Sequence, residues 1–164
     1  MTFIKIAPDL PTATKSIGSL SAPASIAVNQ RMPCSSITHS GLTVNGSGQL
    51  VLSANTTFIL FGSPLIEDNT SPYNSTFECQ WYDVTNSVYI GRPLKQWVGI
   101  NSSTAYDRGS IARAVIYPTV STTVEFRIKA VSANLDTVNP VTATAHWGTH
   151  APYAGEQVYA VLSF

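Results

Sequence analysis

Charged residues are scarce in this chain. Only 11% of its 164 residues are charged, with nine Lys and Arg against nine Asp and Glu, so the formal net charge is zero. Nucleic-acid binding requires a clustered basic excess, which this composition does not supply. Disorder is also not expected, because 44% of the residues are hydrophobic. Ser, Thr and Asn fill the polar positions, which favours a β protein partly buried in an assembly over a secreted protein with an uncharged surface.

Cysteine and long apolar runs are scarce as well. Cys34 and Cys79 could form one disulfide or remain as two thiols, and they provide no dense disulfide framework. Cys79 alternates with Trp81, as expected of a small buried hydrophobic residue. The sequence contains no run of about 18 apolar residues, so it predicts no membrane-spanning helix. Prolines interrupt the N-terminal residues, and a signal peptide is therefore not expected. We predict synthesis in the cytoplasm and no membrane partner.

The sequence contains no strong catalytic or metal-binding pattern. Its nine carboxylates are scattered along the sequence. Glycoside hydrolysis requires two carboxylates that face each other across a cleft, and nothing in the sequence indicates such a pair. His146 and His150 are four residues apart, but no third ligand accompanies them, and a pair of loop histidines near Trp147 explains the spacing better than a metal site does. His39 lacks a G-x-S-x-G elbow. We therefore expect no catalytic residue, no metal and no cofactor.

Residues 77–93, FECQWYDVTNSVYIGRP, carry the clearest structural signal. Cys79 and Trp81 fall on one face, Gln80 and Tyr82 fall on the other, and a Val-Thr-Asn-Ser turn follows. Such alternation of aromatic and β-branched residues predicts two half-buried strands joined by a turn. The same alternation over residues 122–131 predicts another strand.

Further strands follow along the chain. They are expected over residues 25–32, 37–44, 49–52, 56–61, 111–117, 141–147 and 157–164. The strand at 56–61 has apolar residues on both faces, which predicts a central position in a sheet. Asn45-Gly46-Ser47-Gly48 predicts a hairpin turn. Residues 95–109 are irregular and polar. Many short strands without a helical period predict an all-β sandwich or barrel in one domain, residues 25–164.

Residues 1–24 differ from the rest of the chain. Prolines punctuate them and disfavour helix, so they predict an extended arm with a short strand over residues 2–6. Such a segment either frays as a tail or orders against a partner. Isolated apolar side chains would be wasted in a free tail, and this favours an anchor. These side chains are Phe3, Ile4, Ile6 and Leu10.

The order of these elements resembles a known family of trimeric jelly rolls. The segments that carry the resemblance are SGLTVNGSGQLVLSANTTFILFG, FECQWYDVTNSVYIG, ARAVIYPTVSTTVEFRI and EQVYAVLSF. They are similar to the jelly roll of the complement-type globular head and the tumour-necrosis-factor superfamily. They also resemble modules of tailed-phage virions, namely capsid decoration proteins and fibre parts. The collagen stalk of the complement branch is absent, because the chain contains no Gly-X-Y run.

The resemblance implies an antiparallel β-sandwich of eight to ten strands that assembles as a homotrimer. Cyclic closure would then cover the adhesive surface of each subunit. The candidates for the three-fold interface are strand residues that the subunit core does not require. These are Tyr82, Tyr89, Phe126, Tyr159 and Phe164.

The resemblance also implies a place in a virion. The expected function is that of a decoration or cement protein, which binds the major capsid protein on the outer capsid surface and stabilises the head by bridging capsomers. The arm would provide the anchor. The alternative is a fibre or tail-tip module that recognises a glycan or protein on the host surface, with aromatic loop residues stacking on a sugar. The loop candidates are Trp97, Tyr106 and Trp147.

Overall fold

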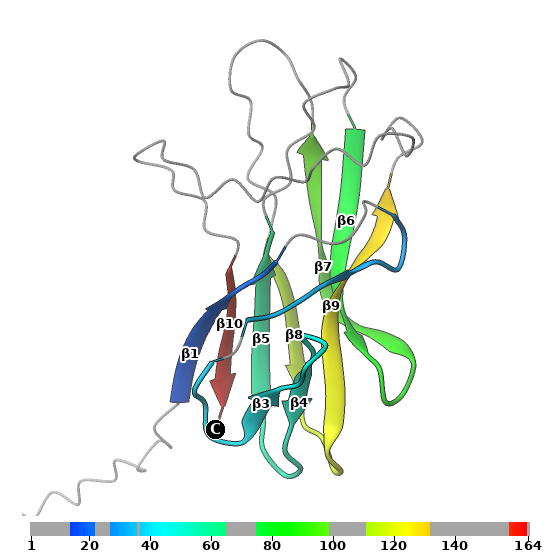
Figure 1. Cartoon of the computed structure of the whole chain (residues 1–164). Helices are drawn as coiled ribbons and strands as arrows, with labels where there is room; N and C mark the ends of the chain where they lie inside the picture. The colour runs from blue at the N-terminus through cyan, green and yellow to red at the C-terminus, as the bar shows by residue number, and fades with distance from the viewer. Residues whose placement is uncertain are drawn as a thin grey trace, which may run out of the picture.

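The computed structural model describes residues 14–21, 27–35, 37–64, 75–98, 111–131 and 158–163. Every regular element within these residues is a β-strand, which confirms the predicted all-β class (Figure 1). The strands are β1 (Thr14–Ser19), β2 (Arg31–Met32), β3 (Leu42–Val44), β4 (Leu50–Leu52), β5 (Phe58–Ser63), β6 (Ser75–Asp83), β7 (Val88–Val98), β8 (Ala112–Ile116), β9 (Thr122–Val131) and β10 (Val158–Ser163). The described part of the chain holds no helix that could span a membrane.

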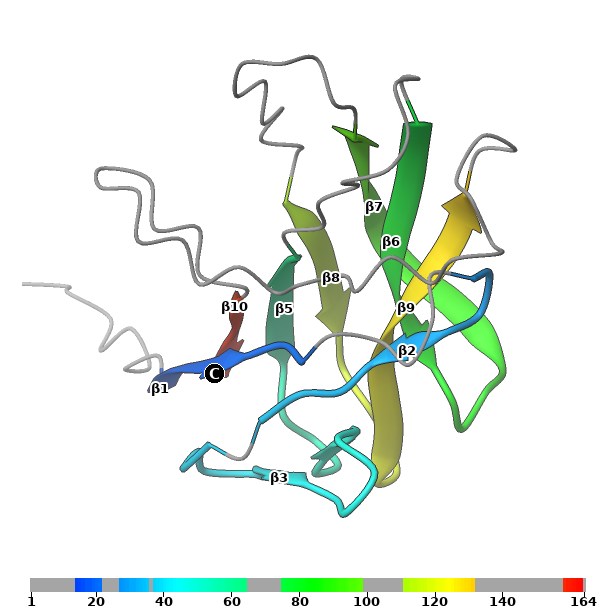
Figure 2. The same cartoon turned by 45° about the horizontal axis from the view of Figure 1, so that its top comes forward.

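The strands pair in a nested, antiparallel order. β1 pairs with β10, β4 with β9, β5 with β8 and β6 with β7, so each pair encloses the next one in the sequence. This arrangement is that of a jelly roll, in which two Greek keys form a sandwich. One layer has the order β1-β10-β5-β8 and the other has the order β7-β6-β9-β4-β3. Figure 2 shows the sheet curling from the first layer into the second.

The two layers join at a corner in β7. Within the described residues, β7 pairs with β8 only at Arg92–Arg113, while residues 88–90 and 94–98 of β7 pair with β6. The register with β6 shifts opposite Gln80, and Gly91 there has a φ of 71°. The buried Gln80 donates from Nε2 to the Gly91 carbonyl oxygen at 2.7 Å. This irregularity bends β7 away from one layer and toward the other.

The core lies between the two layers. Phe126 of β9 reaches the opposite layer, where a Cβ added to Gly62 of β5 would lie 2.5 Å from its Cε2 atom. The rings of Trp81 and Phe126 also pack, with centroids 5.1 Å apart. Phe126 is fully buried within the subunit, so its predicted place at a three-fold interface is wrong. Its ring fills the space between the layers and leaves no surface for another subunit.

Several predicted strands match the structure closely. β9 spans the predicted residues 122–131, and the predicted hairpin is formed by β6 and β7. β5 lies between β10 and β8, as expected of a central strand. Cys79 is completely buried, as its alternation with Trp81 predicts.

Other segments differ from the prediction. The described residues 27–32 of the strand expected over residues 25–32 contain only β2, because residues 27–30 form a turn in which Gln30 N donates to the Ala27 carbonyl oxygen at 3.1 Å. β7 continues through residues 95–98, which were expected to be irregular. The expected strands at 2–6 and 141–147 lie outside the described residues.

The predicted arm also overlaps the folded domain. β1 pairs with β10, and Leu20 is buried in the core, so residues 14–21 belong to the sandwich. The polar residues of β1 concealed this strand in the sequence, because its stability comes from pairing with the distant β10. The anchor residues Phe3, Ile4, Ile6 and Leu10 lie outside the described residues.

We expect Gly91→Ala to lower the free energy of unfolding by about 2–4 kcal/mol, through strain at positive φ and overpacking. The added methyl group would meet the backbone of Arg113 and Ala114 in β8. Urea denaturation would measure this loss. Gly46→Ala is the matched control, because a Cβ there meets nothing within 4 Å. Equal stability of the two variants would contradict the role of Gly91 at the corner.

Candidate interaction surfaces

The outer side of the β1-β10-β5-β8 layer carries a patch of apolar side chains next to the exposed Lys15. It carries the side chains of Ile17 from β1, Ile59 and Phe61 from β5, and Val115 from β8, which we call the apolar face. Ile59 is paired with Val115, so their side chains share one side of the sheet. Ile17 is 56% exposed and Val115 is 58% exposed, while Ile59 and Phe61 are half-buried. A sheet side with several exposed aliphatic residues is typical of an interaction surface.

The apolar face ends in two cations. Arg113 of β8 is paired with Phe61 of β5, and the Arg113 guanidinium lies 5.9 Å from the Phe61 ring centroid. Across the corner Arg113 is paired with Arg92, and both side chains are exposed. Facing like charges destabilise a sheet. No carboxylate of the described residues forms an ion pair with either arginine, so this end of the face favours an acidic partner group.

The outer side of the other layer is aromatic and charged. Tyr82 of β6 and Tyr89 of β7 meet edge to face, with ring centroids 5.0 Å apart. The Arg127 guanidinium lies 3.6 Å from the Tyr82 centroid, and Lys129 Nζ lies 5.7 Å from that of Tyr89. Lys129 Nζ also lies 2.8 Å from Glu78 Oε1. We call these five residues the aromatic face. Its cations already cover the ring faces, which leaves little room for a stacking ligand.

The Tyr89 hydroxyl is fixed by a neighbour from another part of the chain. It donates to Asn29 Oδ1 at 3.0 Å. Burial raises the pKa of Tyr89, and the nearby Arg127 partly opposes this effect. The phenol therefore stays protonated at neutral pH and keeps its role as a donor.

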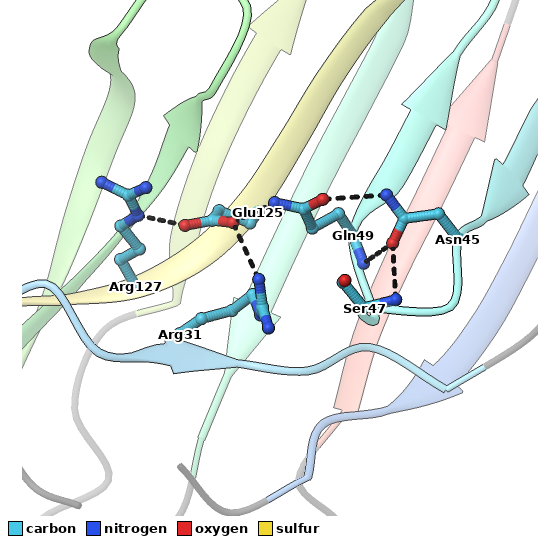
Figure 3. Close-up of polar contacts among 6 residues, drawn as sticks. All are labelled: Arg31, Asn45, Ser47, Gln49, Glu125 and Arg127. Atoms are coloured by element: carbon cyan, nitrogen blue, oxygen red, sulfur yellow. Dashed lines mark hydrogen bonds and ion pairs between the residues drawn. The ribbon is translucent and has the colours of Figure 1, made fainter. Parts of the chain in front are cut away.

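A buried carboxylate lies beside the aromatic face. Glu125 of β9 is 3% exposed, and its Oε1 atom accepts a hydrogen bond from Arg127 Nε. Its Oε2 atom accepts from Gln49 Nε2 at 2.6 Å and lies 3.7 Å from Arg31 Nη1 (Figure 3). Gln49 Oε1 accepts in turn from Asn45 Nδ2 at 2.8 Å. We call these five residues the Glu125 network. The network joins β2, the β3–β4 turn and β9. It gives the Glu125 carboxylate the hydrogen-bond and ion-pair partners without which its charge would be costly to bury.

The predicted interface and loop residues are only partly brought together. Tyr82 and Tyr89 are in contact, but they lie on the aromatic face and not on the apolar face. Tyr159 belongs to β10 and Trp97 to β7, but their side chains lie outside the described part. Phe164, Tyr106 and Trp147 lie outside the described residues altogether.

The two cysteines are free and buried. Burial raises the pKa of Cys34 to about 12, and it also raises the pKa of Cys79. Thiolate is the reactive form of cysteine, so neither residue is prepared for nucleophilic chemistry. Among the described residues, no three His, Cys, Asp or Glu side chains gather as a metal site would require. His146 and His150 lie outside them.

Sequence reasoning missed both the apolar face and the Glu125 network. The alternation in β9 placed Glu125 and Arg127 on the same side, but Arg31 and Gln49 join them only through strand register. Comparison with protein-family models and with curated proteins finds no match for this chain.

We expect Glu125→Gln to lower the free energy of unfolding by about 2–4 kcal/mol, because it leaves two arginines without their shared carboxylate. Glu78→Gln removes a more exposed pair with Lys129 and should cost about 0.5 kcal/mol or less. Urea denaturation of both variants would measure the difference. Equal losses would contradict a stabilising role for the Glu125 network.

Proposed function

We propose that this chain is a virion structural protein, a homotrimeric decoration or cement protein of a capsid. In this proposal it binds the major capsid protein on the outer capsid surface and stabilises the head by bridging capsomers. The observation that supports it most is the apolar face on one layer of a jelly roll, with Ile17 and Val115 more than half exposed. The sequence resemblance supplies the virion context.

The apolar face supports self-association for a physical reason. Burying apolar surface contributes about 25 cal/mol per Å², and three copies closing in a ring would remove such surface from water in each subunit. A cyclic trimer joins two different patches of each subunit. The apolar face would be one patch, and its two arginines favour an opposing patch that carries carboxylates.

The alternative is a fibre or tail-tip module that binds a host glycan or protein. The aromatic face is the described surface that would serve it, because Tyr82 and Tyr89 are only partly buried. However, Arg127 and Lys129 lie against these rings, whereas a sugar needs an open ring face. The geometry therefore supports the decoration role better than glycan stacking at this surface.

The trimer can be tested with a matched pair of variants. We expect Val115→Lys to convert the trimer to monomers, since it replaces an exposed aliphatic side chain of the apolar face, paired with Ile59, with a charge that would be costly to bury against apolar surface. Val88→Lys changes a comparably exposed valine at the start of β7 and should leave the trimer intact. Light scattering coupled to size exclusion would measure both. A monomeric wild-type protein, or equal behaviour of the two variants, would contradict the proposed interface.

The anchoring role of the N-terminal residues can be tested separately. Deletion of residues 1–13 removes Phe3, Ile4, Ile6 and Leu10 but retains β1 and the buried Leu20. We expect the shortened protein to remain trimeric and to lose attachment to purified undecorated capsids, measured by co-sedimentation. Saturation of the capsids by the shortened protein would show that these residues are not the anchor.

A further inference from the structure

The turn between β3 and β4 holds the Asn45 side chain in a defined position. Asn45 Oδ1 accepts hydrogen bonds from the backbone N–H of Ser47 at 3.0 Å and of Gln49 at 3.1 Å. Asn45 Nδ2 donates to Gln49 Oε1 at 2.8 Å (Figure 3). Asn45 and Gly46 are both exposed, so water reaches the turn.

The residue after Asn45 suits attack on this side chain. Gly46 presents no side chain, and a Cβ built on it would meet nothing within 4 Å. Within the described part of the chain, the Gly46 N–H has no hydrogen-bond partner. Asn45-Gly46 is also the one Asn-Gly pair in the sequence. An asparagine followed by glycine cyclises readily, because no side chain hinders the attacking nitrogen.

The reaction is a spontaneous deamidation. The Gly46 nitrogen loses its proton and bonds to Asn45 Cγ, and the electron pair of the carbonyl bond moves to Oδ1. The carbonyl bond then re-forms from the electron pair on Oδ1 as the Cγ–Nδ2 bond breaks, and Nδ2 takes a proton from water and leaves as ammonia, which produces a five-membered succinimide. Water opens this ring to aspartate or isoaspartate. Negative charge develops on Oδ1, the atom that already accepts two backbone hydrogen bonds, and donors in this position stabilise such an oxyanion.

The product would disturb the Glu125 network because the hydrogen bonds of that network have a direction. Gln49 accepts from Asn45 through Oε1 and donates to Glu125 through Nε2. An ionised carboxylate at position 45 has no hydrogen to donate. If the Gln49 amide turned round to donate to it, Oε1 would face the Glu125 carboxylate. One of the two contacts is lost in either orientation.

We propose that Asn45 is a site of spontaneous deamidation, and that its conversion uncouples the β3–β4 turn from the buried Glu125. The modification is irreversible without a repair enzyme, so it marks the age of the folded protein. It is independent of the proposed virion role, since it rests on the turn and the Glu125 network alone.

The first test measures where deamidation occurs. The full-length protein would be incubated in mildly alkaline buffer and its peptides followed by mass spectrometry. Asn86 is the internal control, because it also lies in an exposed turn. Its side-chain Nδ2 donates a hydrogen bond to Asp83 Oδ2 at 2.7 Å. Asn86 is followed by Ser87, and its Oδ1 accepts no hydrogen bond from the described residues.

We expect deamidation at Asn45 to be at least about tenfold faster than at Asn86, since a single well-placed oxyanion donor contributes about 100-fold in enzymes. Gly46→Ala should slow the reaction at Asn45 and leave Asn86 unchanged. Equal rates at Asn45 and Asn86 in the wild-type protein would overturn the site assignment.

The second test measures the effect of the product on the Glu125 network. Asn45→Asp reproduces one product, and Ser47→Asp adds the same charge to the same turn without touching the Gln49 side chain. We expect Asn45→Asp to raise the unfolding equilibrium constant about tenfold, which is the effect of losing one hydrogen bond of the Glu125 network. Ser47→Asp should change it about twofold or less. Equal effects of the two variants would overturn the coupling to Glu125.

Discussion

The close contact between the Phe126 ring and the backbone of Gly62 sets the separation of the two layers. Any side chain at position 62 would overlap the ring, so glycine is required opposite phenylalanine. Trp81 then packs against the same ring from the neighbouring strand β6. The remaining core side chains are confined to the space that this contact leaves, as the close packing of protein interiors demands. A smaller residue at 126 would open a cavity between the layers and not only remove one contact.

The strand that carries Phe126 also organises the opposite surface. β9 alternates between core residues and a row that contains Glu125, Arg127 and Lys129. Glu125 is drawn into a buried network, while Arg127 also covers Tyr82 and Lys129 approaches Tyr89. A shift of β9 by one residue would exchange these two sets and place charges between the layers. Burial of Phe126 and partnering of Glu125 therefore specify the same register.

Local alternation made much of this fold predictable. β9 and the β6–β7 hairpin follow their patterns closely because each buries one side. β1 could not be predicted, since Thr, Ser and Lys dominate it and its partner β10 lies at the other end of the sequence. The corner at Gly91 depends on contact with β8, and the Glu125 network depends on residues brought together from three segments. The anchor, the trimer and the virion role stay predictions, because they concern partners outside the chain.

The distribution of charge gives the sandwich two unlike sides. The described carboxylates, Glu78, Asp83 and Glu125, all belong to β6 or β9, and each has a polar or cationic partner within the subunit. Arg92 and Arg113 lie at the corner beside the apolar face, without an ion-pair partner among the described residues. An interface on that face must bring in its own negative groups, because burying a cation without a partner costs more than the adjoining apolar contact contributes. Among the described residues, the three carboxylates therefore serve the fold, while Arg92 and Arg113 border the surface that favours a partner.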